Sequence, residues 1–209
     1  SGTTSHTFVF GMNGVADVTT NATVNGAFPI TGNTFAAVSV SNPELATLTI
    51  ASIATGGSVN GGTTGFLAGQ FSLQSANSAV NVKSIKLTET GTINASADLT
   101  NIKLMNGTTQ VGVAVASLNA DGTIVFDLSS NPLQITSGAT INLSIYADIA
   151  GGVNRNFRFT VQRAYDIIAT DMTYNVGATV SATSFPVNAS QVSVNAGSLV
   201  VSKNINSPV

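Results

Sequence analysis

The most constraining feature of this 209-residue sequence is a series of short runs in which apolar and polar residues alternate. Successive side chains of a strand point to opposite faces. Residues 139–147 therefore place Ile141, Leu143 and Ile145 on one face and polar side chains on the other. Residues 156–163 repeat the pattern with both arginines outward. Runs of this kind recur along the chain and predict an all-β protein.

Turn signals separate these runs. Asn106-Gly107 predicts a turn joining 101–105 to 109–117, and Asp121-Gly122 predicts one joining 109–117 to 123–128. In residues 80–87 the apolar face changes phase near Ser84, which predicts a bulge or a bend. Residues 164–168 are the best helical candidate, for a single turn.

Composition supports the same fold class. Charged residues make up 8% of the chain, and Glu occurs only at Glu44 and Glu89, so long helices lack their usual surface residues. Strands spaced in this way predict an Ig-like or Greek-key β-sandwich with almost no helix, with a jelly-roll-like sandwich as the alternative.

The chain divides into five expected segments. A weak echo links 38–40 and 48–52 to 192–194 and 199–203, and each half leads into a loose stretch. For residues 13–55 we favour extra strands of the main sandwich over a separate subdomain, because so short a β segment has little core of its own. The segments are an N-terminal strand or arm (1–12), additional strands or a small β subdomain (13–55), a Gly-rich linker or loop (56–62), the main sandwich (63–198) and a C-terminal strand and tail (199–209).

Charge and composition exclude several classes of partner. The net charge is −2 and the basic residues are scattered, so nucleic acid and anionic membranes are not expected ligands. No stretch is long and apolar enough to insert the mature chain into a bilayer. Cysteine is absent, which excludes disulfides and thiol chemistry. The Thr/Ser/Asn-rich composition predicts an exported, extracellular or cell-surface protein after removal of a signal peptide, with trimming for expression as the alternative.

The sequence offers no catalytic set and no cofactor motif. His6 is the one histidine, so no Ser-His-Asp arrangement can be built, and we predict no enzyme activity. Paired carboxylates of a glycosidase remain the least favoured alternative. A Ca²⁺ site is a minority alternative to ordinary loop residues. Its fragments would be Asp148 with Gly151, Gly152 and Asn154, or Asp166 with Asp171.

Acceptor motifs for N-glycosylation occur at five asparagines, and several are expected by chance in this composition. If the organism glycosylates exported proteins, these are the surface candidates. They are Asn21, Asn94, Asn106, Asn142 and Asn188.

The stretch 99–112, followed by 118–123 and 135–140, has a recurring order of strand, short glycine turn and strand. It resembles the β-sandwich modules of secreted prokaryotic surface proteins, both surface-layer-like proteins and extracellular filament or pilus subunits. The resemblance covers roughly residues 64–176 and implies a structural role at the cell surface. In some such subunits a terminal strand of one copy completes a neighbour's sheet.

The N-terminal run suits such a strand. Phe8 and Phe10 share one face, and insertion into an open sheet edge would bury both in a neighbour and build a homopolymer. The competing interpretation is that residues 5–10 pair inside their own sandwich. The predicted polymerisation strand is Thr7, Phe8, Val9 and Phe10, and the rival C-terminal strand is Leu199, Val200 and Val201.

The leading hypothesis is therefore a structural subunit of an extracellular filament, pilus or surface layer that assembles by donor-strand exchange between copies of itself. The alternative is a monomeric adhesion or binding module that contacts a host or surface glycan, or a viral coat or spike protein. The least favoured hypothesis is a secreted glycoside-active enzyme.

Overall fold

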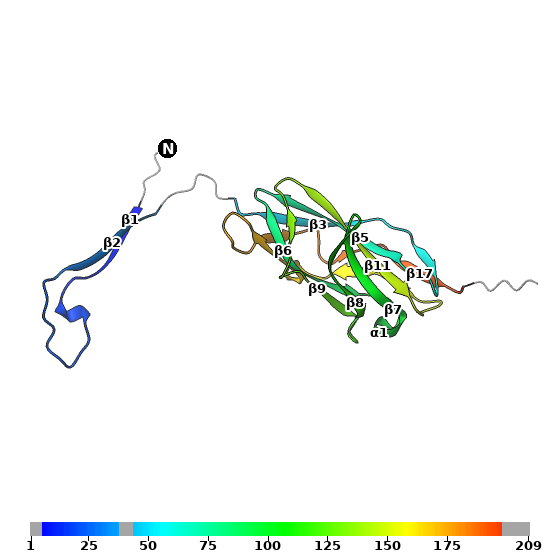
Figure 1. Cartoon of the computed structure of the whole chain (residues 1–209), viewed down its shortest axis with the longest axis horizontal. Coiled ribbons are helices and arrows are strands. Elements are labelled where there is room, and N and C mark those ends of the chain that lie inside the picture. The colour runs from blue at the N-terminus through cyan, green and yellow to red at the C-terminus, as the bar shows by residue number, and fades with distance from the viewer. Residues whose placement is uncertain (1–5, 38–43, 198–209) are drawn as a thin grey trace, which may run out of the picture. The chain divides into compact units, whose positions relative to one another are not determined.

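The structure is a computed structural model that describes residues 6–37 and 44–197 (Figure 1). The chain forms two compact units, which divide between Pro43 and Glu44. Each unit has its own strands.

The first unit is a two-stranded antiparallel ribbon. Its elements are β1 (His6–Met12), the 3-10 turn η1 (Val15–Asp17) and β2 (Ile30–Ala37). The pairing runs from His6 opposite Ala37 to Met12 opposite Ile30, with a register shift between Val9 and Gly11. No side chain described in this ribbon is buried, so it lacks the core that independently stable sheets have.

The second unit contains two six-stranded sheets and one three-stranded sheet. The first six-stranded sheet has the order β15-β3-β5-β11-β7-β8, and the small sheet has the order β12-β17-β4. The other six-stranded sheet is organised around β6, which pairs with β9, β10, β13 and β14, while β16 pairs with β13.

The early strands of this unit are β3 (Thr47–Ile53), β4 (Ser58–Asn60), β5 (Phe66–Ala76), β6 (Val80–Glu89), β7 (Leu99–Asn106), β8 (Thr109–Ser117), β9 (Thr123–Asp127) and β10 (Leu133–Ile135). The later strands are β11 (Thr140–Ile149), β12 (Asn156–Phe157), β13 (Phe159–Val161), β14 (Ile167–Asp171), β15 (Thr179–Ser181), β16 (Val187–Asn188) and β17 (Val192–Asn195). The helical elements are α1 (Ala95–Asp98) and the 3-10 turn η2 (Ala164–Asp166).

The two larger sheets pack face to face. A void of about 10 Å³ between them is lined by Leu73 and Leu143 from one sheet and Ile85 and Leu87 from the other. The buried side chains of both sheets form one hydrophobic cluster. The prediction of an all-β sandwich with little helix is therefore confirmed.

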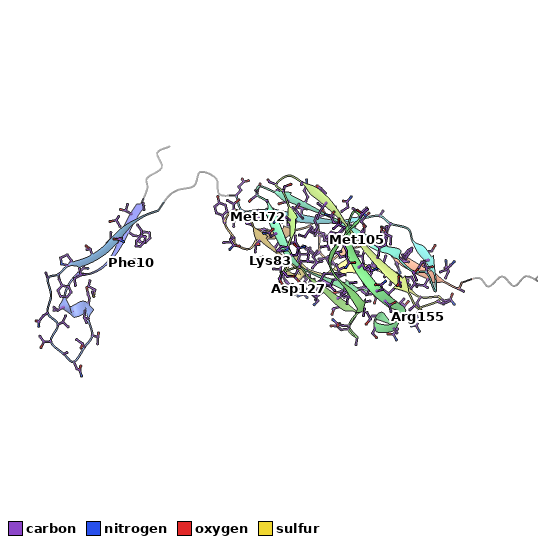
Figure 2. All side chains as sticks on the ribbon, in the orientation of Figure 1. Phe10, Lys83, Met105, Asp127, Arg155 and Met172 are labelled. Atoms are coloured by element: carbon purple, nitrogen blue, oxygen red, sulfur yellow. The ribbon has the colours of Figure 1, made fainter. Side chains whose placement is uncertain are left out.

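Several local expectations are also confirmed. Phe157 and Phe159 are fully buried, while Arg158 between them is only partly covered. Opposite β14, the register of β6 shifts at Lys83 (Figure 2), next to the predicted change of phase at Ser84. Residues 164–166 form the single helical turn.

The connection after β8 differs from the expected hairpin. Asn106-Gly107 does join the paired strands β7 and β8, with Gly107 at φ 58°. The segment 118–122 instead carries the chain from β8 to β9, which pairs with β6 in the other sheet. A local turn signal cannot show which sheet receives the next strand.

The boundary between the two units, at Pro43 and Glu44, falls inside the expected second segment, 13–55. Residues 47–53 form β3, which lies inside the sandwich sheet between β15 and β5 and buries Leu48 and Ile50. Residues 56–62, expected as a linker or loop, contain β4, which pairs in parallel with β17 and buries Val59. This pairing joins residues far apart in the sequence, so no local pattern in the glycine-rich segment predicts it.

Candidate interaction surface

The ribbon exposes a cluster of three phenylalanines. The ring of Phe8 stacks on Phe35 at 5.3 Å between centroids and meets Phe10 edge to face at 5.7 Å. These side chains remain 50% (Phe8), 51% (Phe35) and 74% (Phe10) exposed. Figure 2 shows Phe10 on this unit. We call Phe8, Phe10 and Phe35 the aromatic cluster.

The backbone of the ribbon brings this cluster together. Phe8 lies directly opposite Phe35 in the antiparallel pair, where cross-strand side chains contact each other. Gly11 allows the strands to approach after the register shift, because a Cβ there would lie 2.9 Å from the carbonyl oxygen of Ile30. The predicted polymerisation strand, residues 7–10, thus lies within β1 and pairs with β2 of its own chain.

The carboxylates proposed as Ca²⁺ fragments have structural partners. Asp148 accepts hydrogen bonds from the Gly65 amide (2.6 Å) and the Asn101 side chain (2.9 Å), which hold its pKa below the usual range. The side chain of Asp166 caps its own turn by accepting from the Arg163 amide at 2.9 Å. Gly151 donates to the backbone carbonyl of Asp98, not to Asp148.

Asp171 joins β14 to the start of β3. Its carboxylate accepts from the amides of Ala46 (2.8 Å), Thr173 (2.7 Å) and Tyr174 (3.0 Å) and from the Ser78 hydroxyl (3.3 Å). Burial acts to raise the pKa of Asp171, but these hydrogen bonds outweigh it and lower the pKa. Among the described residues, no group of three or more His, Cys, Asp or Glu side chains is arranged to hold a metal ion.

Glu89 is the one described carboxylate with a strongly raised pKa. Burial raises its pKa from 4.5 to about 7, and its Oε1 atom is buried without a hydrogen-bond partner.

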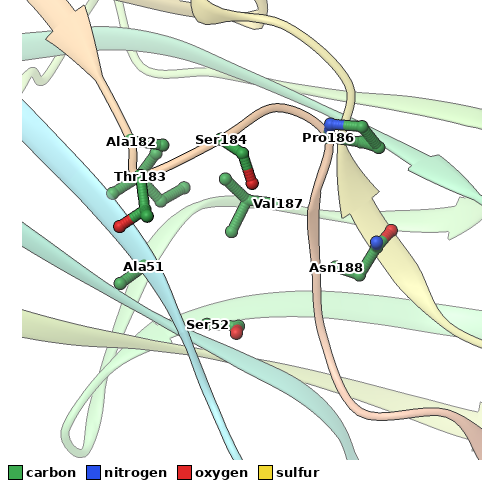
Figure 3. A pocket seen from close by; sticks show the side chains of 9 residues that line it. Ala51, Ser52, Ala182, Thr183, Ser184, Pro186, Val187 and Asn188 are labelled. Atoms are coloured by element: carbon green, nitrogen blue, oxygen red, sulfur yellow. The ribbon is translucent and has the colours of Figure 1, made fainter.

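A shallow hollow lies where the chain crosses from β15 to β16 (Figure 3). Its volume is about 310 Å³. β15 pairs with β3 only as far as Thr49, and beyond that point β3 has a described strand partner, β5, on one side only. Methyl and hydroxyl groups dominate the lining, which consists of Ile50, Ala51, Ser52, Ala182, Thr183, Ser184, Pro186, Val187 and Asn188.

The glycosylation candidates occupy different environments. Asn21, Asn94 and Asn142 are exposed, whereas Asn106 and Asn188 are partly covered. The Asn188 side chain also accepts a hydrogen bond from the Thr160 hydroxyl at 2.9 Å. Exposure therefore favours the first three as acceptors.

Two sequence expectations fall on residues with little or no description. Leu199, Val200 and Val201, the rival C-terminal strand, lie outside the described residues. His6 begins β1 and pairs in its backbone with Ala37.

In the part of the chain that is described, no helix has the length and apolar character needed to cross a membrane.

No family model and no curated protein matches the sequence. A chain in a crystal structure of a CaDoc0917–CaCohA2 complex is similar, at 12% identity and a TM-score of 0.36, over 72% of this chain and 99% of that chain. The seventh ScaB type I cohesin from Pseudobacteroides cellulosolvens is similar at 12% identity and a TM-score of 0.32, over 77% of this chain and 98% of its own. Likeness at this level carries no functional argument, and the sandwich assignment depends on this chain's own sheets.

Proposed function

We propose that this chain is a non-enzymatic structural module of the cell exterior, a β-sandwich that is joined to other sandwiches through its N-terminal ribbon. The observation that carries the proposal is the aromatic cluster, three phenylalanines half or more exposed on a ribbon without a core. Exposed apolar groups of this kind mark protein–protein contacts. The composition, poor in charge and rich in Ser, Thr and Asn, supports an exported protein.

Strand exchange is the mode of joining that the ribbon suits. β1 pairs with β2 along one edge, and its other edge has no described strand partner. An unpaired edge beside exposed phenylalanines supplies the two elements of strand addition, free backbone groups and apolar side chains. In a homopolymer, the ribbon of one copy would insert into the sandwich of the next.

The test is the association state of the full chain. We expect the wild-type chain to self-associate and the double substitution Phe8→Asp with Phe10→Asp to remain monomeric. Burying the exposed parts of these two phenylalanines contributes roughly 2–4 kcal/mol, so association should weaken by about a hundredfold. Sedimentation velocity across a concentration series, with electron microscopy of the same samples, measures the change.

Val113→Asp is the matched control. Val113 is 79% exposed on β8 of the sandwich, so the substitution adds a negative charge, one where the double variant adds two, at another exposed apolar position. Association of the control should equal that of the wild type. A wild-type chain that stays monomeric throughout, or a double variant that associates normally, would contradict the proposal.

A binding module is the second candidate, favoured by the hollow beside β3. Its hydroxyl and methyl lining and the unpaired end of β3 suit an extended peptide or a neutral sugar better than a charged ligand. Chemical-shift mapping with neutral peptides and oligosaccharides would test it. Perturbations confined to residues 50–52 and 182–188 would support the module, and their absence would remove this candidate.

A further inference from the structure

The ribbon has the same strand pattern as the last strands of the sandwich. Phe8-Val9-Phe10 lies in β1, and Phe157-Arg158-Phe159 spans β12 and β13. β1 pairs antiparallel with β2, while β12 and β13 pair antiparallel with β17 and β16. In both places two phenylalanine rings meet edge to face, with centroids 5.7 Å apart in the ribbon and 6.2 Å apart in the sandwich.

The registers of the two strand pairs agree at four matching positions, two on each side of an irregularity. Adding 149 to the residue numbers of β1 gives their counterparts in β12 and β13. Adding 157 to those of β2 gives their counterparts in β17 and β16. In the ribbon the register shifts between Val9 and Gly11, and in the sandwich the same one-residue change falls between the pairs made by Phe157 and by Thr160. The matching pairs are Thr7–Ala36 with Asn156–Ser193, Phe8–Phe35 with Phe157–Val192, Gly11–Thr31 with Thr160–Asn188, and Met12–Ile30 with Val161–Val187.

The turn after the first strand is repeated as well. η1 ends at Asp17 and η2 ends at Asp166, each nine residues after the first phenylalanine of its strand. Each aspartate accepts a hydrogen bond from the backbone amide three residues earlier, at 3.3 Å from Gly14 and 2.9 Å from Arg163. A Phe-Pro pair then precedes β2 at 28–29 and β16 at 185–186.

The shared features are independent of each other, which argues against coincidence. Any two hairpins share antiparallel pairing, but they need not share a bulge, a capped 3-10 turn and a phenylalanine pair at the same positions. The connecting segments differ: residues 167–184 are longer than residues 18–27 and carry β14 and β15.

The ribbon and its counterpart in the sandwich differ in how far their phenylalanines are buried. Phe157 and Phe159 are fully buried, because β13 pairs along its other edge with β6, where Phe159 lies opposite Glu89 and Thr160 opposite Thr88. The corresponding edge of β1 has no described strand partner, and Phe10 is 74% exposed. The ribbon therefore shows the closing strands of a sandwich without the strand that pairs with them.

We infer that residues 6–37 are the closing strands of a second sandwich of the same kind, and that this chain contains parts of successive units of one repeating module. The occupant of the open edge of β1 is then a β6-like strand of that unit, with Phe10 opposite its Glu89 position and Gly11 opposite its Thr88 position. The inference goes beyond the proposed function, because it names the partner of the ribbon as another unit of this module.

The sequence beyond the ribbon fits a repeat. β3 opens the sandwich with Leu48-Thr49-Ile50 shortly after the ribbon, and Leu199-Val200-Val201 follows β17 in the same order, outside the described residues. A unit would thus begin with a strand like β3 and end with strands like β16 and β17.

The test restores the missing strands. A copy of residues 44–154 is placed directly before His6 of the chain, so that the added strands precede the ribbon as residues 44–154 precede Arg155. We expect amides of residues 8–12 to exchange at least about a hundredfold more slowly than in the unextended chain, because they enter a cooperative unit. A monomer should show this protection, so the readout does not depend on self-association.

Two substitutions in the extended chain distinguish core burial from mere contact. Phe10→Ser should abolish the protection, because Phe10 takes the place of the buried Phe159. Val9→Ser should leave it, because Val9 takes the place of the outward Arg158. Equal effects of both substitutions would overturn the inference.

A positive control carries residues 44–197, with their own closing strands, ahead of the full chain. If that control folds as two sandwiches while the ribbon of the extended chain stays unprotected, the inference is overturned. The register itself is checked in the unextended chain by nuclear Overhauser effects between Phe8 and Phe35 and between Gly11 and Thr31. A ribbon without these contacts would overturn the repeat, whatever the extended chains do.

Discussion

At the residue scale, Glu89 links stability to pH. Its pKa is 4.5 when exposed and about 7 in the fold, where burial penalises the charged form. The folded state therefore holds this proton more tightly than the unfolded chain does. Stability from this group is full below pH 4.5 and declines as the pH rises from 4.5 to 7.

We expect Glu89→Gln to remove this decline. The neutral amide keeps the shape of the side chain without a buried charge, so the variant should be about 1 kcal/mol more stable than the wild type at pH 8, after allowance for solvent around the group. Urea unfolding at about pH 4.5 and about pH 8 measures the difference. A variant that loses stability with pH as steeply as the wild type would show that another group is responsible.

The same scale shows what sequence reasoning can find. Phe8 and Phe10 were identifiable as part of a candidate polymerisation strand because both lie on one face of a short run. Phe35, which completes the aromatic cluster, was not, because its contact depends on the pairing of β1 with β2. The buried oxygen of Glu89 was equally hidden, since burial depends on the packing of distant segments.

At the element scale, β9 shows how alternation determines packing. Phe126 is 1% exposed within the core, while Val125 beside it is 48% exposed. Phe126→Ala should cost about 3–5 kcal/mol, because it removes apolar contacts and leaves a cavity. Val125→Ala should change stability by less than about 0.5 kcal/mol. Thermal or urea unfolding compares the two, and similar losses would mean that β9 faces the core differently.

Elements were predicted where the signal is local. The alternation around Phe157, the bulge in β6 and the turn at 106–107 each depend on a few neighbouring residues, and the structure contains all three. The parallel pairs of β15 with β3 and of β17 with β4 join distant segments, so no short pattern reveals them. The transfer of the chain from β8 to the other sheet was missed for the same reason.

At the scale of the whole molecule, the repeat between ribbon and sandwich was also beyond sequence reasoning. The two segments share a phenylalanine pair, an aspartate and a Phe-Pro pair, which is little in a composition dominated by Val, Thr, Ser and Asn. Only the backbone register shows that these residues occupy equivalent positions. The ribbon shares the register of the closing strands but not their burial, and this combination is what indicates that it belongs to a second sandwich.

Stability at this scale belongs to the second unit. Every buried apolar side chain in the described residues lies between Ala46 and Val194, and none lies in the ribbon. We therefore expect deletion of residues 1–43 to leave the urea midpoint and slope of the sandwich unchanged, since the slope follows the surface exposed on unfolding. The same deletion should abolish self-association, because it removes the aromatic cluster. A lower midpoint in a monomeric sample would mean that residues 1–43 contribute to the stability of the sandwich, and unchanged association would place the contact between copies on the sandwich itself.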